Sequence, residues 1–438
     1  MRKYFLSFNI LNFSKTFLSL ILSVSAFAIF AQPALDNIKA VDSIYADNIQ
    51  TVQLTTSQLG SNVAMMNLGQ GALKLIFDDL NNEIKDYLYT IDQFDRNWQP
   101  SRLEKIEYLD GFTEERINNF KNSFATNVQF VHYELVIPNA TVRLTKSGNY
   151  LLRVYEDTPE KTLILTRRFV IIEPILTPVP ATTSTSATNY NTHQELDFSI
   201  ELKTFRVQNP MNEIRVSVIQ NGRWDNAHLL VQPTYVQGDR IIYDYQDTIA
   251  FAAGKEWRYV DLRSSRFRSE RVARIDKGDE TWEVTLRPDL DRSREPYLIY
   301  PDLNGGYFVE TQDFTIDNDN SLRADYLNVH FSLFKKEELE EKDVYIFGSL
   351  TDWKINDKYK LTYNSETSRY ESSLSLKQGF YNYGYATIPK GKKQFDCSEL
   401  EGDWYETENE YTFLIYLRAF GARYDRVVGF YKYKTNRR

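Results

Sequence analysis

Alternation of apolar and other side chains with a period of two constrains this chain more than any other feature. In the segment KSGNYLLRVY, residues 146–155, a Ser-Gly turn is followed by side chains that point alternately to two faces. Tyr150, Leu152 and Val154 share one face, and the residues between them share the other. This pattern predicts a strand with one face more buried than the other.

The same pattern recurs along most of the chain. Strand-like segments include NVQFVHYELVIPN (127–139), TLILTRRFVII (162–172), EIRVSVIQNGRWD (213–225) and LNVHFSLF (327–334). The composition agrees, because 30 Tyr and 27 Phe stand against 4 Met, and aromatic residues favour pleated, half-buried surfaces. Short strands separated by turns are typical of β-sandwiches. We therefore expect an all-β protein.

Length and composition predict three domains. A chain of 438 residues corresponds to two to four domains of roughly 100–200 residues each. A segment rich in Pro, Thr and Ser, residues 173–189, is predicted to be a linker or an extended hinge loop. We expect three tandem β-sandwiches of the immunoglobulin-like or early-set-like type, at residues 32–174, 175–312 and 313–438, with the linker at the start of the second.

The N-terminus has the order of a secretory signal peptide. Arg2 and Lys3 precede an apolar run from Phe17 to Phe30, and Ala31 offers a small residue at the cleavage site. The run is shorter than the ~20 residues that span a bilayer. We expect residues 1–31 to be removed and the mature protein to be exported without a membrane span; an uncleaved anchor is the alternative.

Charge and motifs exclude several function classes. The formal net charge of −8 disfavours general nucleic-acid binding, which depends on an excess of Lys and Arg. The four histidines are scattered, and the sequence contains no zinc-protease pair, nucleophile elbow, phosphate loop or cysteine-pair metal motif. We therefore predict no catalytic, metal-binding or cofactor-binding residue. A hydrolase that uses two of the abundant carboxylates is a further hypothesis with no motif behind it.

An arginine-rich segment is one candidate contact surface. The segment RSSRFRSERVARIDKG (263–278) contains Arg263, Arg266 and Arg268, which are candidates for contact with an acidic or phosphate-bearing partner. The simpler interpretation is a solvated strand or loop balanced by nearby carboxylates.

A second candidate lies in the last segment. YIFGSLTDWK (345–354) and LKQGFYNYGYA (376–386) resemble a glycogen-binding type of carbohydrate module. In such a module Trp353 and the stripe of Tyr381, Tyr383 and Tyr385 would stack on sugar rings. The alternative places these aromatic side chains in the core or in an interface, because such sandwiches are often reused without sugar binding.

An ordered set of segments resembles a known family. YLDGF (108–112), VHYELVIPN (131–139), KSGNYLLRVY (146–155) and TRRFVIIE (166–173) follow the signal peptide in this order, and FGSLTDW (347–353) lies in the last segment. Together they resemble the type IX secretion system plug protein family. The resemblance implies a non-enzymatic protein in the periplasm, at the periplasmic face of the outer membrane. It would seal the periplasmic end of a giant outer-membrane β-barrel translocon of the SprA type when no cargo passes. The alternative function is a periplasmic or surface carbohydrate-binding protein that uses Trp353 and the nearby tyrosines.

Overall fold

Strands account for nearly all of the regular structure. The computed structural model describes residues 39–56, 62–176, 178–203, 205–314 and 320–435, so the predicted signal peptide, residues 1–31, lies outside the described residues. Strands make up 47% and helices 6% of the described residues. The α-helices of the described part are single turns: α1 (Lys105–Tyr108), α2 (Pro210–Glu213), α3 (Asn320–Arg323) and α4 (Ser398–Glu401). The all-β prediction is confirmed, and no helix of the described part is long and apolar enough to cross a membrane.

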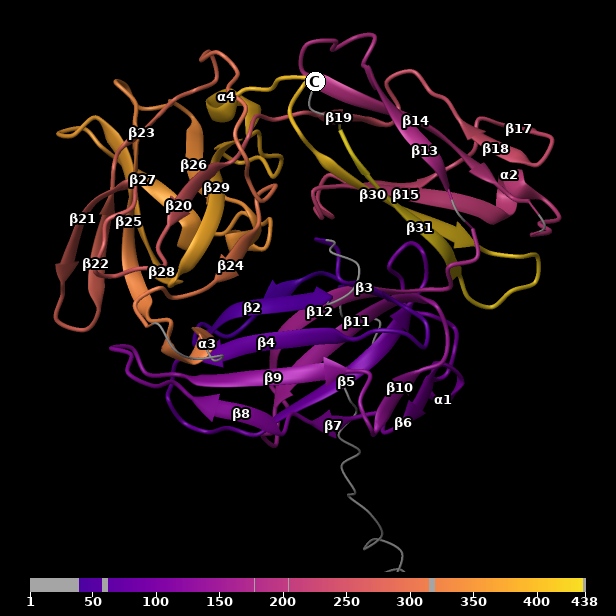
Figure 1. Ribbon diagram of the computed structural model, residues 1–438, viewed down its shortest axis with the longest axis horizontal. Coiled ribbons are helices and arrows are strands. Elements are labelled where there is room, and N and C mark those ends of the chain that lie inside the picture. Colours follow the sequence, from indigo (N-terminus) through magenta and orange to yellow (C-terminus); the bar gives the residue numbers. More distant parts are fainter. Residues whose placement is uncertain (1–38, 57–61, 177, 204, 315–319, 436–438) are drawn as a thin grey trace, which may run out of the picture. The chain divides into compact units, whose positions relative to one another are not determined.

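The first sandwich contains the strands up to Ile172 (Figure 1). One sheet has the order β1 (Ser43–Ile44), β12 (Leu163–Ile172), β11 (Gly148–Glu156), β5 (Tyr87–Phe94) and β7 (Glu115–Arg116), and β3 (Met65–Asn67) also pairs with β12. The opposite sheet has the order β2 (Ile49–Thr56), β4 (Leu73–Asp79), β9 (Val131–Ile137) and β8 (Asn119–Asn122). Strands β6 (Leu109–Gly111) and β10 (Val142–Leu144) form a separate pair. The two large sheets enclose one apolar core that includes Phe77, Tyr133 and Tyr150.

Strand β11 contains the alternating segment from which the strand prediction started. Its predicted core face, with Tyr150 and Leu152, belongs to the apolar core. The other face is only slightly less buried, because Leu151 and Arg153 are 0% and 5% exposed. Arg153 donates through Nε to Asp92 Oδ2 at 2.6 Å, and β11 lies between β5 and β12. A central strand with a buried ion pair on its outer face is therefore covered on both sides.

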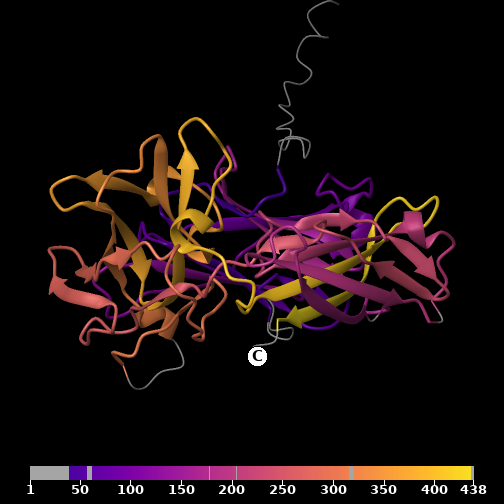
Figure 2. The ribbon, with the colours of Figure 1, turned by 90° about the horizontal axis from the view of Figure 1, so that it is seen from above.

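The second sandwich joins strands from two distant parts of the chain. One sheet has the order β13 (Pro178–Thr185), β14 (His193–Glu201), β18 (Arg240–Tyr243) and β17 (Tyr235–Gln237), with β19 (Ala250–Ala252) on β14. The other has the order β16 (His228–Val231), β15 (Ile214–Gln220), β30 (Glu410–Leu417) and β31 (Arg426–Lys434). Figure 2 shows the C-terminal pair, in yellow, beside the pink strands of this sandwich.

The third part is one continuous ten-stranded sheet. Its main order is β20 (Arg258–Asp261), β29 (Gly379–Pro389), β26 (Lys342–Phe347), β27 (Lys360–Asn364), β28 (Arg369–Lys377), β25 (Tyr326–Phe334), β22 (Trp282–Leu286) and β21 (Val272–Lys277). Strands β23 (Asp289–Leu290) and β24 (Tyr307–Val309) pair with β25 and β29. The rings of Phe331 on β25 and Tyr383 on β29 lie 5.1 Å apart although the strands are not neighbours, so the sheet wraps around its own core.

The strand pairing does not follow the predicted segment boundaries. Strands β20 to β24, within the predicted middle domain 175–312, belong to the ten-stranded sheet. Strands β30 and β31, within the predicted domain 313–438, complete the second sandwich. The Pro/Thr/Ser segment predicted to be a linker contains the edge strand β13, paired with β14. An edge strand tolerates proline, because one side of its backbone needs no partner.

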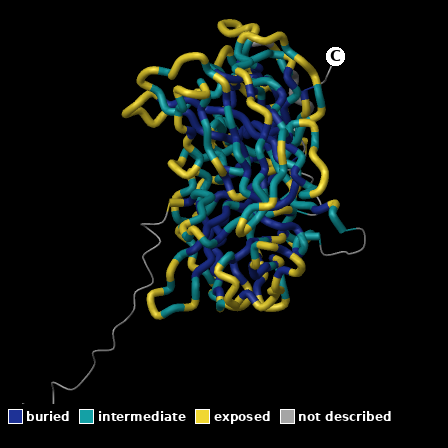
Figure 3. The backbone as a smooth tube through the Cα atoms, turned by 90° about the vertical axis from the view of Figure 1, so that its left-hand side faces the viewer, coloured by how far each residue is buried: buried dark blue, intermediate teal, exposed yellow. Residues whose placement is uncertain are grey.

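Buried contacts join the sandwiches within Ala40–Arg438, which form one compact unit. An apolar cluster brings Met65 and Val170 of the first sandwich against Leu414 and Val427 of the second. Buried residues lie mainly in the interior of the molecule, and exposed residues lie mainly at its periphery (Figure 3).

A buried ion pair joins the first sandwich to the ten-stranded sheet. Asp78 on β4 and Lys377 on β28 are both 1% exposed, and Lys377 Nζ lies 2.5 Å from Asp78 Oδ2. Tyr326 OH donates to the same oxygen at 2.7 Å, and His132 Nδ1 lies 2.6 Å from the other oxygen. Burial alone would raise the pKa of Asp78, but the neighbouring Lys377 and His132 lower it. The carboxylate therefore stays ionised inside the protein.

Candidate functional site

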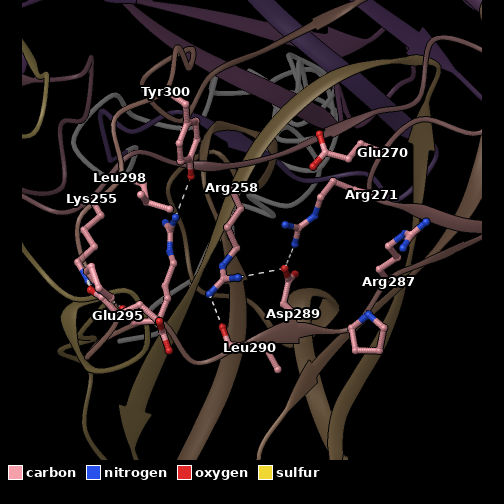
Figure 4. Close-up of a pocket in the computed structure, with 13 residues that line it drawn as sticks. Lys255, Arg258, Glu270, Arg271, Arg287, Asp289, Leu290, Glu295, Leu298 and Tyr300 are labelled. Carbon is pink, nitrogen blue, oxygen red and sulfur yellow. Dashed lines mark hydrogen bonds and ion pairs between the residues drawn. The ribbon is translucent and has the colours of Figure 1, made fainter.

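A pocket of about 760 Å³ opens beside β20 and β23. We call it the arginine pocket, because its lining includes Arg258, Arg271, Arg287 and Arg292, with Lys255 on one wall (Figure 4). Ligand sites in proteins typically measure roughly 300–1,000 Å³. Its volume therefore makes the arginine pocket a candidate functional site.

One buried carboxylate organises the floor of the pocket. Asp289 is 2% exposed and accepts a hydrogen bond from Arg258 Nη1 at 3.0 Å and another from Arg271. The hydroxyl groups of Tyr383 and Tyr385 donate to its second oxygen at 2.9 and 2.8 Å. The carboxylate thus accepts hydrogen bonds from two guanidinium groups and two hydroxyl groups. It holds the guanidinium groups of Arg258 and Arg271 in place at the floor of the pocket.

A second buried carboxylate holds the other side of the pocket. Glu401 accepts from Arg258 Nε at 3.0 Å and from Arg292 Nε at 2.5 Å. Burial alone would raise the pKa of Glu401, but the two guanidinium groups lower it. Burial and the neighbouring Arg292 lower the pKa of Lys255, whose Nζ donates to the carbonyl oxygens of Arg292 and Glu295 at 2.8 Å each.

The pocket has a local excess of positive charge. Five cations line it, against the three carboxylates Glu270, Asp289 and Glu295; with Glu401 beneath, the balance is five to four. Arg287 is exposed at the rim and has no ion-pair partner among the described residues. Leu290 and Leu298, which also line the pocket, are 60% and 71% exposed. The site thus combines an unpaired guanidinium with apolar walls.

A row of aromatic rings leads away from the pocket. We call Tyr300, Tyr259, Phe380 and Phe308 the aromatic ladder. The ring centroids of Tyr300 and Tyr259 are 6.1 Å apart, those of Tyr259 and Phe380 are 5.7 Å apart, and those of Phe380 and Phe308 are 5.9 Å apart. The last three rings lie on β20, β29 and β24, which pair side by side. Tyr300 also lines the arginine pocket, so the ladder starts at its wall.

Of the three candidate contact arginines, Arg263 lies against the aromatic ladder. Arg263 forms ion pairs with Asp261 and Glu310 and stacks over Phe308 at 5.9 Å. Its charge is therefore balanced by carboxylates. Arg266 and Arg268 are exposed; Arg266 stacks over Phe314 at 5.8 Å, and Arg268 donates to the carbonyl oxygen of Ala273 at 3.0 Å.

The candidate stripe of Tyr381, Tyr383 and Tyr385 is not on the surface. The three residues are 2%, 0% and 0% exposed and belong to the core of the ten-stranded sheet. Alternation along β29 turns them inward and turns Phe380 outward. The three tyrosines are therefore not surface contact residues, since a buried ring cannot stack on a ligand from outside.

Trp353 is half-buried in an aromatic cluster. Its ring centroid lies 5.3 Å from that of Trp257 and 5.6 Å from that of Phe347, and Arg223 stacks over it at 5.2 Å. These neighbours pack Trp353 into the aromatic cluster and leave its ring only partly exposed. The carbohydrate-binding alternative therefore has no support.

Sequence reasoning missed the arginine pocket as a site. The described residues contain no group of three or more His, Cys, Asp and Glu side chains that could hold a metal ion. Arg258, Asp289 and Glu401 are far apart in the sequence and meet only through the fold. The segment RPDLDR, residues 287–292, was the available signal, because it places two carboxylates between two arginines directly after a strand.

The fold and the site define an all-β protein whose outstanding surface feature is a basic, apolar-walled pocket. Residues 49–173 match the family model for the type 9 secretion system plug protein 1st domain. The chain belongs to the type IX secretion system plug protein family, and it has a role in type IX secretion.

A solved structure shares the whole fold. The crystal structure of a hypothetical protein from Parabacteroides merdae ATCC 43184 is 32% identical, with a TM-score of 0.85, over 91% of this chain and 100% of that chain. A match to the collagen adhesin of S. aureus, 7% identical over 91% of this chain and 96% of that chain, has a TM-score of 0.09 and carries no argument. The search of curated proteins gave no match.

Proposed function

We propose that this protein is a non-enzymatic plug that closes the periplasmic end of the type IX outer-membrane β-barrel, of the SprA type, when no cargo passes. The observation that carries the proposal is the family match over residues 49–173, which spans β2 to β12 and thus nearly all of the first sandwich. The predicted signal peptide supports a location in the periplasm, at the inner face of the outer membrane.

The packing of the described residues suits a steric seal. A seal needs a rigid body and a large contact area, and stable protein contacts usually bury roughly 1,200–2,000 Å² in total. The apolar cluster around Leu414 and the buried pair of Asp78 and Lys377 tie the sandwiches together. Such contacts keep the surface of a stopper in one arrangement without any chemical step.

The test compares a deletion strain with its parent. We expect the deletion to admit vancomycin through the outer membrane while cargo secretion largely continues, because only the closed state is lost. A tagged full-length chain should restore resistance and co-purify with the barrel from detergent-solubilised membranes. Normal vancomycin resistance in the deletion strain, together with no barrel in the purified material, would refute the proposal.

A further inference from the structure

The arginine pocket and the aromatic ladder form one continuous outer surface. Tyr300 belongs to both. From there the rings of Tyr259, Phe380 and Phe308 cross three paired strands to Arg263. Phe308 is 39% exposed, so the far end of the ladder is open to a partner.

The charge of this surface limits what can bind to it. Arg287 carries an unpaired positive charge, while Glu270 and Glu295 stand at the same pocket. A guanidinium binds a carboxylate through two parallel hydrogen bonds. The two glutamates would repel a ligand with several negative charges, such as a polyphosphate or a nucleic acid. One carboxylate is therefore the best match.

The apolar part of the surface indicates the rest of the ligand. Leu290 and Leu298 are exposed apolar side chains of the pocket, and the ladder continues with aromatic rings. Interfaces between proteins are enriched in aromatic residues and arginine, and their energetic centres combine these residues. A protein segment with apolar side chains beside its carboxylate fits this surface along its length.

We propose that the arginine pocket and the aromatic ladder dock an extended segment of a partner protein that carries one carboxylate flanked by apolar side chains. The carboxylate binds Arg287 at the rim, and the flanking side chains pack on Leu290, Leu298 and the ladder. The inference deepens the proposed function and rests on it for the partner, a component of the secretion translocon. The docking chemistry itself can be tested on the purified chain.

The experiment uses a labelled peptide and the full mature chain. The probe is a fluorescein-labelled peptide, Ser-Gly-Phe-Leu-Glu-Leu-Phe-Gly-Ser, and its partner has Gln in place of Glu. Fluorescence anisotropy should show at least tenfold tighter binding of the Glu peptide. Arg287→Gln should abolish this preference, and Phe308→Ser should weaken binding of both peptides. Arg294→Gln, at an exposed arginine outside the pocket lining, is the matched control and should bind like the wild type.

Several results would overturn the inference. Equal affinity for the Glu and Gln peptides, no binding of either, or an unchanged preference in Arg287→Gln would each do so. Displacement of the peptide by millimolar inorganic phosphate, tighter binding to vesicles with anionic lipids, or a concentration-dependent dimer that excludes the peptide would assign the surface to another occupant. Urea midpoints equal to the wild type confirm that each variant is folded.

The outcome is separable from that of the proposed function. Peptide binding that depends on Arg287, together with a failure of the full chain to co-purify with the barrel, would keep the docking surface and reject the plug. Barrel co-purification that persists in Arg287→Gln, with peptide binding lost, would keep the plug and reject this surface as its contact with the translocon.

Discussion

Replacing Asp78 with asparagine should strongly destabilise the protein. Asp78→Asn keeps the size of the side chain but removes the only carboxylate that contacts Lys377 in the described residues, at 2.5 Å. The ammonium group would then retain cation–π contacts with the rings of Phe130 and Tyr326, at 3.9 and 5.7 Å. Because Lys377 is 1% exposed, water cannot replace the lost charge.

The expected loss follows from burial. Removing one partner of a buried ion pair typically costs about 3–5 kcal/mol. The variant can avoid the uncompensated charge by releasing the proton of Lys377. The ordinary pKa of lysine, about 10.4, lies about 3.4 units above pH 7, and each unit corresponds to ~1.36 kcal/mol. Releasing the proton at pH 7 therefore costs about 4.6 kcal/mol. The free energy of unfolding should therefore fall by about 3–5 kcal/mol at pH 7, and the deficit should shrink as pH rises toward 10.

Urea-induced unfolding followed by tryptophan fluorescence measures this loss. The matched control is Lys74→Met. Lys74 lies on β4, as Asp78 does, and its Nζ forms an ion pair with Glu134 at the same distance of 2.5 Å. That pair is 47% and 27% exposed, so its loss should cost less than about 1 kcal/mol. The double variant Asp78→Leu with Lys377→Met should recover part of the stability, because it removes both buried charges. The recovery is incomplete, because His132 and Tyr326 lose their hydrogen bonds to Asp78. A deficit of Asp78→Asn below about 1 kcal/mol at pH 7, or one independent of pH, would refute this reasoning.

Four further outcomes are expected. The pKa of Asp78 is lowered in the folded protein. Its contribution to stability is therefore fully present above the ordinary pKa of about 3.9 and is lost as pH falls through the folded-state pKa. The urea midpoint should consequently fall more steeply with decreasing pH in the wild type than in the double variant. Tyr385→Phe removes one of the hydrogen bonds to Asp289 and should lower the unfolding free energy by about 1–2 kcal/mol in calorimetry. Trp353→Ala should cost about 3 kcal/mol by the same measurement, with no retention on amylose before or after the change. Burial raises the pKa of Cys397 to about 12, so at pH 8 its thiol should react with Ellman's reagent roughly a thousandfold more slowly than an ordinary cysteine, because only the thiolate reacts.

Local pattern predicted the strands, because alternation depends only on neighbouring residues. The segment EYTFLIYL forms β30, whose eight residues are all buried. An apolar run on both faces is typical of a central strand, and β30 does lie between β15 and β31. The same run says nothing about which strand is its partner. Which strands pair over a long sequence separation depends on the packing of the whole chain. The local pattern therefore could not predict that strands of the third predicted segment would pair with strands of the second.

The arginine pocket depends on the same long-range pairing. Arg258, Asp289 and Glu401 each look like ordinary surface charges in their own segments. Antiparallel pairing of β20 with β29 places Arg258 opposite Tyr383, and helix α4 brings Glu401 to the same guanidinium. The sequence could supply the charges but not their meeting point, because no spacing rule connects three residues on three separate elements.

Strand β29 contributes residues both to the core and to the outer surface. Its alternation divides the segment GFYNYGYA between two faces. On the inner face Tyr383 and Tyr385 donate to Asp289, which holds Arg258 at the pocket floor. On the outer face Phe380 stacks within the aromatic ladder. The buried tyrosines therefore support the pocket through Asp289, and Phe380 contributes its ring to the outer surface. A substitution on either face of this one strand changes the same docking surface, through its support in one case and through its contact area in the other.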